Sequence, residues 1–241
     1  KGLLPPVEER LPKDVYVVVP NERVGDYGGT LYTVARDSGW GEDVNMMDIM
    51  SGFVKPNADA TDIEMNFIKD AQSNADYTVW RFYLREGLRW SDGHPFSTED
   101  IQFWHEDIMQ NEELTTWIGD NYMADGKFVD LVVIDDYTFE FHYAAPKPGL
   151  LYTLTHDGWP GLQHPKHYLK QFHPNYVDAA ELEARVKEAD FERWIDLFED
   201  RNEKFGNLSW NPERPTLTAF VLKEASSTHR VWERNPYFWK V

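Results

Sequence analysis

Five carboxylate side chains between residues 92 and 107 are the candidate catalytic groups of this sequence. Paired carboxylates beside a sugar-binding cleft hydrolyse glycosidic bonds, with one acting as acid and the other as nucleophile or base. Most of these residues fall in one turn and one helix. There, Asp92 would form the turn and Asp100 would cap the helix, without any reaction. We therefore predict no catalytic residues. The set consists of Asp92, Glu99, Asp100, Glu106 and Asp107.

A metal centre is the second kind of chemistry that the sequence could support. The chain has 8 His and no Cys, and His164 and His167 are three residues apart, with His156 and His173 on either side. Zinc sites need three or four converging ligands, whereas His164 precedes a proline in a turn. We expect no metal ligands and no cofactor. The sequence also contains neither a Gly-x-Ser-x-Gly elbow nor a Gly-x-x-x-x-Gly-Lys phosphate loop.

The carboxylates belong to a predicted strand, double turn and helix. Residues 77–85 alternate in polarity, which predicts a half-buried strand with Trp80 and Phe82 on one face. Glu86-Gly87 and Ser91-Asp92-Gly93 predict two turns. Ser97 and Asp100 have the spacing of a capping box. The helix that follows presents Ile101, Trp104 and Ile108 on one face.

This segment also carries a resemblance to a known family. Leu84 to Asp100 reads L-R-E-G-L-R-W-S-D-G-H-P-F-S-T-E-D and closely resembles the signature of the family 5 extracellular solute-binding proteins. These are receptors of ABC importers for oligopeptides, dipeptides, nickel and some oligosaccharides. I-D-D-Y-T-F-E-F at 134–141 and R-N-P-Y-F-W at 234–239 resemble two further family motifs. The three stretches occur in the family's order, and the resemblance covers the chain from about Gly28 onward.

The resemblance implies an α/β fold of the type II periplasmic-binding-protein kind, whose two lobes close on a ligand about a hinge. Residues 1–35 would be the first segment of lobe one. Residues 36–145 would be an inserted subdomain with the signature, and residues 146–241 a return segment of lobe one up to the hinge strand. Family members are longer than this chain, so we expect an N-terminal fragment with the second lobe absent.

The same resemblance implies that the protein captures a small solute for the membrane permease of an ABC importer. Tryptophan-rich loops favour an oligosaccharide and most family members bind peptides, so both an oligopeptide and an oligosaccharide remain open. The implied location is periplasmic or extracellular, with anchoring through a removed N-terminus as an open alternative. A function of a different class would be a carbohydrate-active enzyme or its accessory sugar-binding module.

Seven candidate ligand-binding residues follow from the resemblance of their segments. An exposed indole at Trp40, between two glycines, would either stack on a ligand or anchor its loop. Two departures from the family pattern occur: no D-P-H follows the first strand, and residues 211–216 replace the family's N-G-x-aromatic stretch. The candidates are Ser38, Gly39, Trp40, Trp117, Tyr122, Asp157 and Trp159.

The composition excludes several classes of protein. With 42 Asp and Glu against 24 Lys and Arg, the net charge is −18. Nucleic-acid binding is therefore disfavoured, because phosphates attract basic surfaces. Net charge of this size favours a soluble monomer. No apolar run approaches the roughly 18 residues of a membrane span.

The remaining elements are predicted from periodicity and turn residues. We expect Asp190-Phe191 to break the longest helical stretch, 179–205. The expected strands cover 15–19 and 28–35, with 63–70 beside the central strand. The expected hairpins pair 128–134 with 137–143 and 216–223 with 228–235. Short helices are expected at 45–54 and 150–155.

Overall fold

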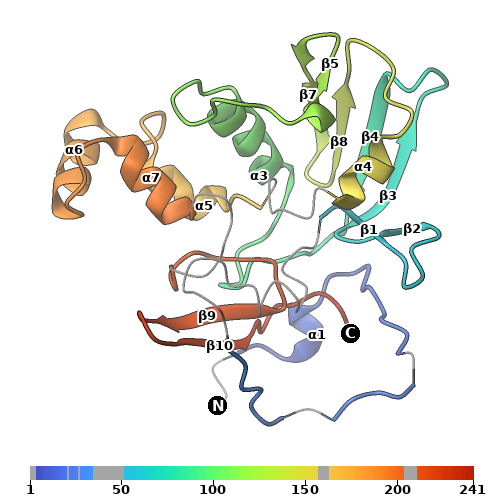
Figure 1. Ribbon diagram of the computed structural model, residues 1–241, viewed down its shortest axis with the longest axis horizontal. Helices are drawn as coiled ribbons and strands as arrows, with labels where there is room; N and C mark the ends of the chain where they lie inside the picture. The colour runs from blue at the N-terminus through green and yellow to red at the C-terminus, as the bar shows by residue number, and fades with distance from the viewer. Residues whose placement is uncertain (1–3, 21, 27, 35–51, 157–162, 204–210) are drawn as a thin grey trace.

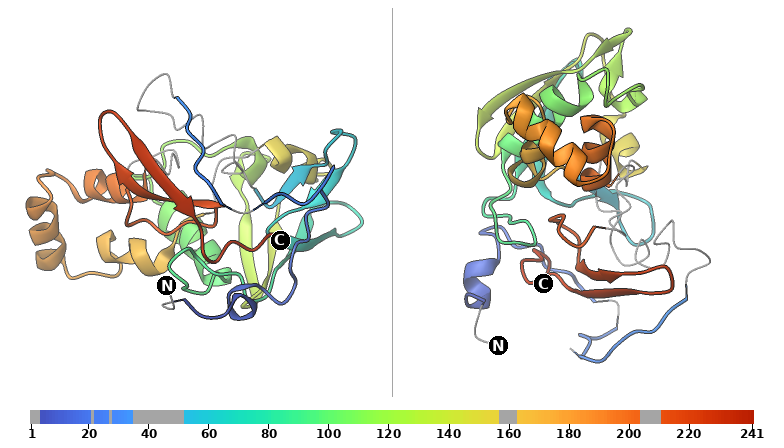
Figure 2. Two further views of the ribbon diagram at one scale, coloured as in Figure 1. Left: turned by 90° about the horizontal axis from the view of Figure 1, so that it is seen from below. Right: turned by 90° about the vertical axis from the view of Figure 1, so that its left-hand side faces the viewer.

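The computed structural model describes residues 4–20, 22–26, 28–34, 52–156, 163–203 and 211–241 (Figure 1). Two groups of elements are apparent. A four-stranded sheet with its helices forms the larger group, and the hairpin β9–β10, α1 (Val7–Arg10) and the N-terminal segment lie together below that sheet in Figure 1 and in the right-hand view of Figure 2. The chain therefore has the mixed helix-and-strand character that the sequence predicts.

The central sheet is antiparallel, in the order β3-β4-β8-β7. Its strands are β3 (Ile68–Ser73), β4 (Val79–Leu84), β8 (Thr138–His142) and β7 (Asp130–Asp135). The alternation predicted for the signature strand is confirmed, since Trp80, Phe82 and Leu84 are buried on one face. Phe139 and Phe141 pair with Phe82 and Trp80 across the strands, and the Phe82 and Phe139 rings stack at 5.2 Å.

The helix after the signature covers this aromatic face. Helix α3 (Thr98–Phe103) continues into a π-helical turn, η2 (Trp104–Met109). Ile101 and Trp104 are buried, and the Trp104 ring lies 6.2 Å from that of Phe141. The predicted face is confirmed for Ile101 and Trp104, whereas Ile108, in the π-helical turn, is buried instead against Leu169 and Phe198.

Shorter elements surround this unit. The strands β1 (Val54–Pro56) and β2 (Ile63–Met65) pair with each other, as do β5 (Met123–Ala124) and β6 (Lys127–Phe128). Helix α4 (Leu150–His156) contacts β1, and the 3-10 turn η3 (Asp120–Tyr122) precedes β5. The second predicted hairpin is confirmed as β9 (Phe220–Ala225) and β10 (Arg230–Arg234).

Residues 166–202 form an arm that projects beside α3 (Figure 1). It consists of α5 (Lys166–Leu169), η4 (Lys170–Phe172), α6 (Ala179–Glu188) and α7 (Trp194–Asn202). The predicted break is confirmed, because Asp190 has a positive φ of 61° between α6 and α7. The arm packs on α3 and η2 through a small cluster in which Phe103, Ile108, Leu169 and Phe198 are buried.

Some expectations were wrong. Residues 28–34 form no strand, and Leu31, Tyr32 and Val34 are 73%, 89% and 91% exposed. Their apolar pattern has no sheet to pair with among the described residues. Val54 begins strand β1 and is not the end of a helix, while residues 45–51 lie outside the described residues. The expected strand 63–70 divides into β2 and β3, and only β3 pairs with the central strand.

The N-terminal segment makes a single parallel bridge, Tyr16 to Lys240, where a strand was expected over 15–19. Val17 and Val19 beside it are 67% and 84% exposed. An exposed apolar strip therefore accompanies this segment. No helix among the described residues is both long and apolar enough to cross a membrane.

Trp80 provides a direct test of the core assignment. It is 6% exposed, and its indole N–H donates to the carbonyl oxygen of Lys147 at 3.2 Å. We expect Trp80→Ala to lower the free energy of unfolding by about 3–5 kcal/mol, because it removes a buried ring and leaves a cavity. The matched control is Trp117→Ala at a site that is 76% exposed. Denaturation midpoints that fall equally in both variants would contradict the assignment.

Candidate functional site

Two distant segments hold the signature loop: the segment before β9 and the arm. Gly87 and Gly93 adopt positive φ values of 88° and 92°, which confirms the two predicted turns. The Ser91 amide donates to the carbonyl of Thr216, and the Thr216 amide donates to Ser91 Oγ at 3.0 Å. The loop and the segment before β9 are thus joined in both directions.

Asp100 is the most deeply buried carboxylate of the signature. The predicted capping box is present: the Ser97 amide donates to Asp100 Oδ2 at 3.1 Å, and Ser97 Oγ accepts from the amide of Glu99. The indole of Trp90 also donates to Oδ2 at 3.3 Å. Oδ1 accepts the amide of Lys166 at 3.0 Å, at the first residue of the arm. Burial raises the pKa of Asp100 to about 6, although these hydrogen bonds act to lower it.

Asp92 makes the second contact to the arm. Its Oδ2 lies 2.7 Å from Nε2 of His167, and its Oδ1 accepts the amide of His94 at 2.9 Å. The rings of His94 and His167 stack at 4.0 Å. Burial opposes ionisation of Asp92, but the hydrogen bonds from His167 and His94 outweigh it and hold its pKa below the usual range. The contacts of Asp92 and Asp100 are those of a turn and a helix cap.

Of the seven candidate ligand residues, the structure describes two. Trp117 is 76% exposed, in the loop between η2 and η3, with its ring over Gly119. Tyr122 is 9% exposed and packs against Trp104, at 4.9 Å between ring centroids. The structure thus gives Trp117 a surface position and Tyr122 a position in the core. The other five lie outside the described residues: Ser38, Gly39, Trp40, Asp157 and Trp159.

The structure adds one exposed aromatic residue that the sequence analysis missed. Tyr152 on α4 is 67% exposed, and α4 ends where the 157–162 segment begins. Helix α4 also contacts η3, next to the loop of Trp117, and Lys147 Nζ donates to the carbonyl of Asp120 at 2.6 Å. The signal in the sequence was the buried pair Leu150 and Leu154, whose i, i+4 spacing leaves Tyr152 off the buried face.

Of the histidines considered as metal ligands, His164, His167 and His173 make separate contacts. His164 Nδ1 contacts Asn202 at the base of the arm, His167 contacts Asp92, and His173 is buried against Phe103 and Phe198. No group of three or more metal-binding side chains occurs among the described residues.

The chain is similar to known proteins in family, sequence and fold. The family model described as bacterial extracellular solute-binding proteins, family 5, matches residues 62–241. The periplasmic alpha-galactoside-binding protein of Rhizobium meliloti (strain 1021) is 28% identical over 100% of this chain and 35% of its own length. The periplasmic oligopeptide-binding protein OppA of Salmonella typhimurium is 26% identical over 48% of this chain and 23% of its own.

Two solved structures share the fold. An oligopeptide-binding protein OppA has 34% identity and a TM-score of 0.86, covering 99% of this chain and 36% of that one. The periplasmic binding protein MelB from Agrobacterium fabrum, in complex with stachyose, has 22% identity and a TM-score of 0.61, covering 98% of this chain and 36% of its own. The predicted periplasmic-binding-protein fold is confirmed. This chain spans about a third of these relatives' length, and each is named as a binding protein.

Gly93 tests the close packing of the signature loop. A Cβ at Gly93 would lie 2.9 Å from the ring of Tyr237, whereas one at Gly126, also at positive φ, would meet nothing within 4 Å. We expect Gly126→Ala to cost about 1 kcal/mol of unfolding free energy from backbone strain alone. Gly93→Ala should cost distinctly more, about 2–3 kcal/mol, because the added methyl group also displaces Tyr237. Equal losses in urea denaturation would contradict this packing.

Asp100 should contribute a characteristic dependence of stability on pH. Its pKa in the folded state, about 6, lies above the ordinary value of 3.8, so the folded state binds a proton first as the pH falls. The free energy of unfolding of the wild type should therefore rise, relative to Asp100→Asn, by about 1 kcal/mol between pH 7 and pH 5. Denaturant unfolding of both proteins at the two pH values measures this. If the free energy of unfolding of the wild type falls relative to that of Asp100→Asn between pH 7 and pH 5, the carboxylate is not buried in this way.

Proposed function

The chain belongs to the bacterial extracellular solute-binding proteins of family 5, and from this we propose that it is part of a receptor for an ABC importer. Such a receptor captures a small oligomeric solute outside the membrane and presents it to a permease. The observation that carries the proposal is the family match over residues 62–241. Closure on the solute would shift the population toward a closed state that binds it more tightly.

An oligosaccharide is the solute that the observations favour. The relative that matches the whole chain is named for binding alpha-galactosides. Exposed aromatic rings suit sugars, because their apolar faces cover the C–H faces of pyranose rings. Trp117 and Tyr152 offer such rings on neighbouring elements, at 76% and 67% exposure. Ser38, Gly39, Trp40, Asp157 and Trp159 remain proposed contacts.

An oligopeptide is the second candidate, and one specific observation supports it. The solved structure with 34% identity and a TM-score of 0.86 is named an oligopeptide-binding protein. A peptide would use main-chain hydrogen bonds from the receptor and pockets for its side chains. The two solutes therefore predict different roles for the exposed aromatic residues.

The proposed role is capture without a reaction. Asp92 and Asp100, the carboxylates best placed for chemistry, are engaged by a turn, a helix cap and the arm. A glycosidase needs two carboxyl groups that face a sugar from opposite sides. We further propose a periplasmic or extracellular location and a monomeric state, which the net charge of −18 favours.

Calorimetry with two panels of solutes tests the proposal. Tri- to pentapeptides and galactosyl oligosaccharides such as stachyose would be titrated into this chain and into a longer protein that contains it. We expect saturable heat from the oligosaccharides. Binding of peptides alone would remove the sugar proposal, and binding of neither class by the longer protein would remove solute capture of both kinds.

Trp117 should contribute to that affinity. We expect Trp117→Ala to weaken binding of the oligosaccharide by at least about tenfold, equal to roughly 1.4 kcal/mol, because a stacked ring is lost. Trp232→Ala, on β10 in the hairpin away from α4, is the matched control and should leave the dissociation constant unchanged. Equal affinities of wild type and Trp117→Ala would exclude Trp117 from the site.

A further inference from the structure

The contact between the signature loop and the arm gathers several groups that exchange protons near neutral pH. His167, in the first turn of α5, places Nε2 2.7 Å from Asp92 Oδ2. Its ring stacks on that of His94 at 4.0 Å with an interplanar angle of 16°. The Asp100 carboxylate accepts the amide of the preceding residue, Lys166. Two carboxylates and one imidazole of the signature therefore contact two consecutive residues of α5.

We propose that this cluster is a pH-sensitive contact that fastens the first turn of α5 to the signature loop at neutral pH and loosens it when His94 takes up a proton. Two stacked imidazoles tolerate each other while at least one is neutral. A proton on His94 places a positive charge on the ring beside His167, and like charges in a partly buried site repel each other strongly. The proposal rests on this geometry and is independent of the proposed solute.

The hydrogen bonds of His167 indicate which protonation state the folded cluster prefers. Within the described residues, its Nδ1 is buried and has no hydrogen-bond partner. A neutral ring that donates from Nε2–H to Asp92 leaves only an unused acceptor at Nδ1. A cationic ring would bury an unsatisfied N–H there, which costs more. A pair with both rings protonated therefore bears this cost in addition to the repulsion between the rings.

Burial lowers the pKa of His94, and the charge of His167 lowers it further. Asp92 and Glu99 act in the opposite direction, and Lys170 adds to the lowering. A base whose pKa is lowered in the closed form binds a proton more readily in an open form. Below the ordinary histidine pKa of about 6.5, falling pH therefore shifts the population toward the open form.

Other charged groups also lie around the cluster. Lys166 Nζ lies 4.0 Å from Glu99, and Arg89 Nη1 donates to the Gly93 carbonyl at 2.9 Å. The ring of Tyr237 closes the other side of Gly93. Asp100 takes up a proton in the same pH range, because burial raises its pKa to about 6. A carboxyl group with a raised pKa in the closed form favours that form when it is protonated, so Asp100 opposes the loosening and His94 alone drives it.

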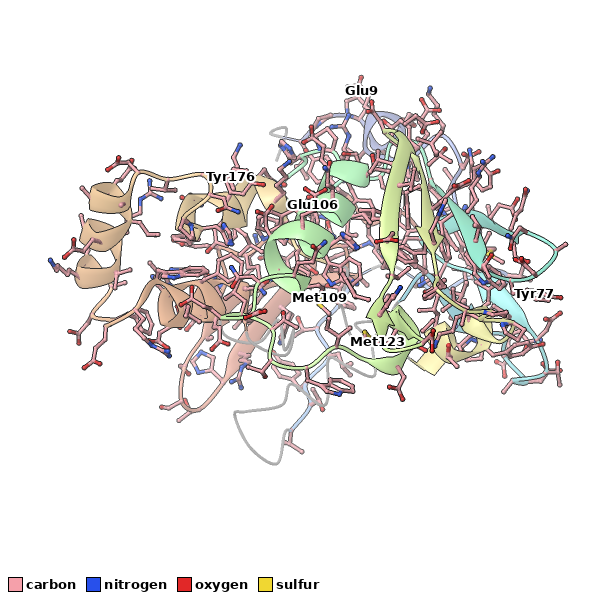
Figure 3. The ribbon with its side chains drawn as sticks, turned by 90° about the horizontal axis from the view of Figure 1, so that it is seen from above. Glu9, Tyr77, Glu106, Met109, Met123 and Tyr176 are labelled. Atoms are coloured by element: carbon pink, nitrogen blue, oxygen red, sulfur yellow. The ribbon has the colours of Figure 1, made fainter. Side chains whose placement is uncertain are left out.

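The arm has a second attachment that does not involve these groups. Tyr176 and Asn175 donate to Asp107 on η2 at 2.6 Å and 2.8 Å, and Figure 3 shows Tyr176 on the arm beside the helix that carries Glu106. The apolar cluster of Phe103 and Leu169 lies between them. The expected response is therefore local loosening of the first turn of α5 and not release of the whole arm.

Hydrogen exchange and NMR titration test the proposal. The amides of Lys166, Tyr168 and Leu169 report on the contact, because they donate to Asp100 and to the Pro165 carbonyl. Amides of β4 serve as the internal reference. After correction for intrinsic exchange, we expect these three to exchange at least about threefold faster at pH 5.5 than at pH 7.5, with β4 unchanged. The imidazole of His94 should titrate below the ordinary value of about 6.5, and His167→Gln should raise its pKa.

Two substitutions make the result specific. His94→Gln removes the titrating ring and should abolish the acceleration. His142→Gln, which removes another histidine paired with a carboxylate, Glu140, on β8, should retain it. The proposal is overturned if His94 of the wild type titrates at or above the ordinary value. It is equally overturned if exchange at α5 is independent of pH, or if the acceleration persists in His94→Gln.

Discussion

The carboxylate of Asp100 joins the signature segment to the start of the arm, 66 residues later in the sequence. It caps α3 through the Ser97 amide, fixes the Trp90 indole within the signature, and accepts the Lys166 amide where the arm begins. A buried carboxylate is costly unless hydrogen bonds replace its water, and these three N–H groups do so. The same carboxylate thus contacts both the start of α3 and the start of the arm. The signature therefore works as a scaffold, since its acidic residues are engaged in holding the fold.

The sequence predicted those features that nearby residues determine. The alternation from Thr78 to Leu84, the glycines at positive φ and the spacing of Ser97 and Asp100 each depend on neighbours within a few residues, so a strand, two turns and a capped helix could be predicted. The hairpin β7–β8 and the division of α6 from α7 have equally local signals. The family resemblance supplied the fold class, because its motifs occur in one order along one scaffold.

Contacts between distant residues could not be predicted in the same way. Nothing near His167 indicates that it reaches Asp92, 75 residues earlier, and nothing near Gly93 indicates the ring of Tyr237. Residues 28–34 have the apolar pattern of a strand, yet a strand needs a partner, and the described residues provide none. Tyr122 and Trp117 share one aromatic loop, and only packing distinguishes the buried ring from the exposed one. The candidate site was thus predictable as segments and not as individual contacts.

A receptor that captures its solute without a reaction releases that solute unchanged. A longer protein that contains this chain would be equilibrated with an oligosaccharide across a dialysis membrane, and the solute on both sides analysed by mass spectrometry after prolonged incubation. We expect the solute to accumulate on the protein side in a stoichiometric amount, with every sugar chain recovered at its original length. Shorter products that increase with time and with protein concentration would contradict it, because they would require two carboxyl groups free to act on the sugar.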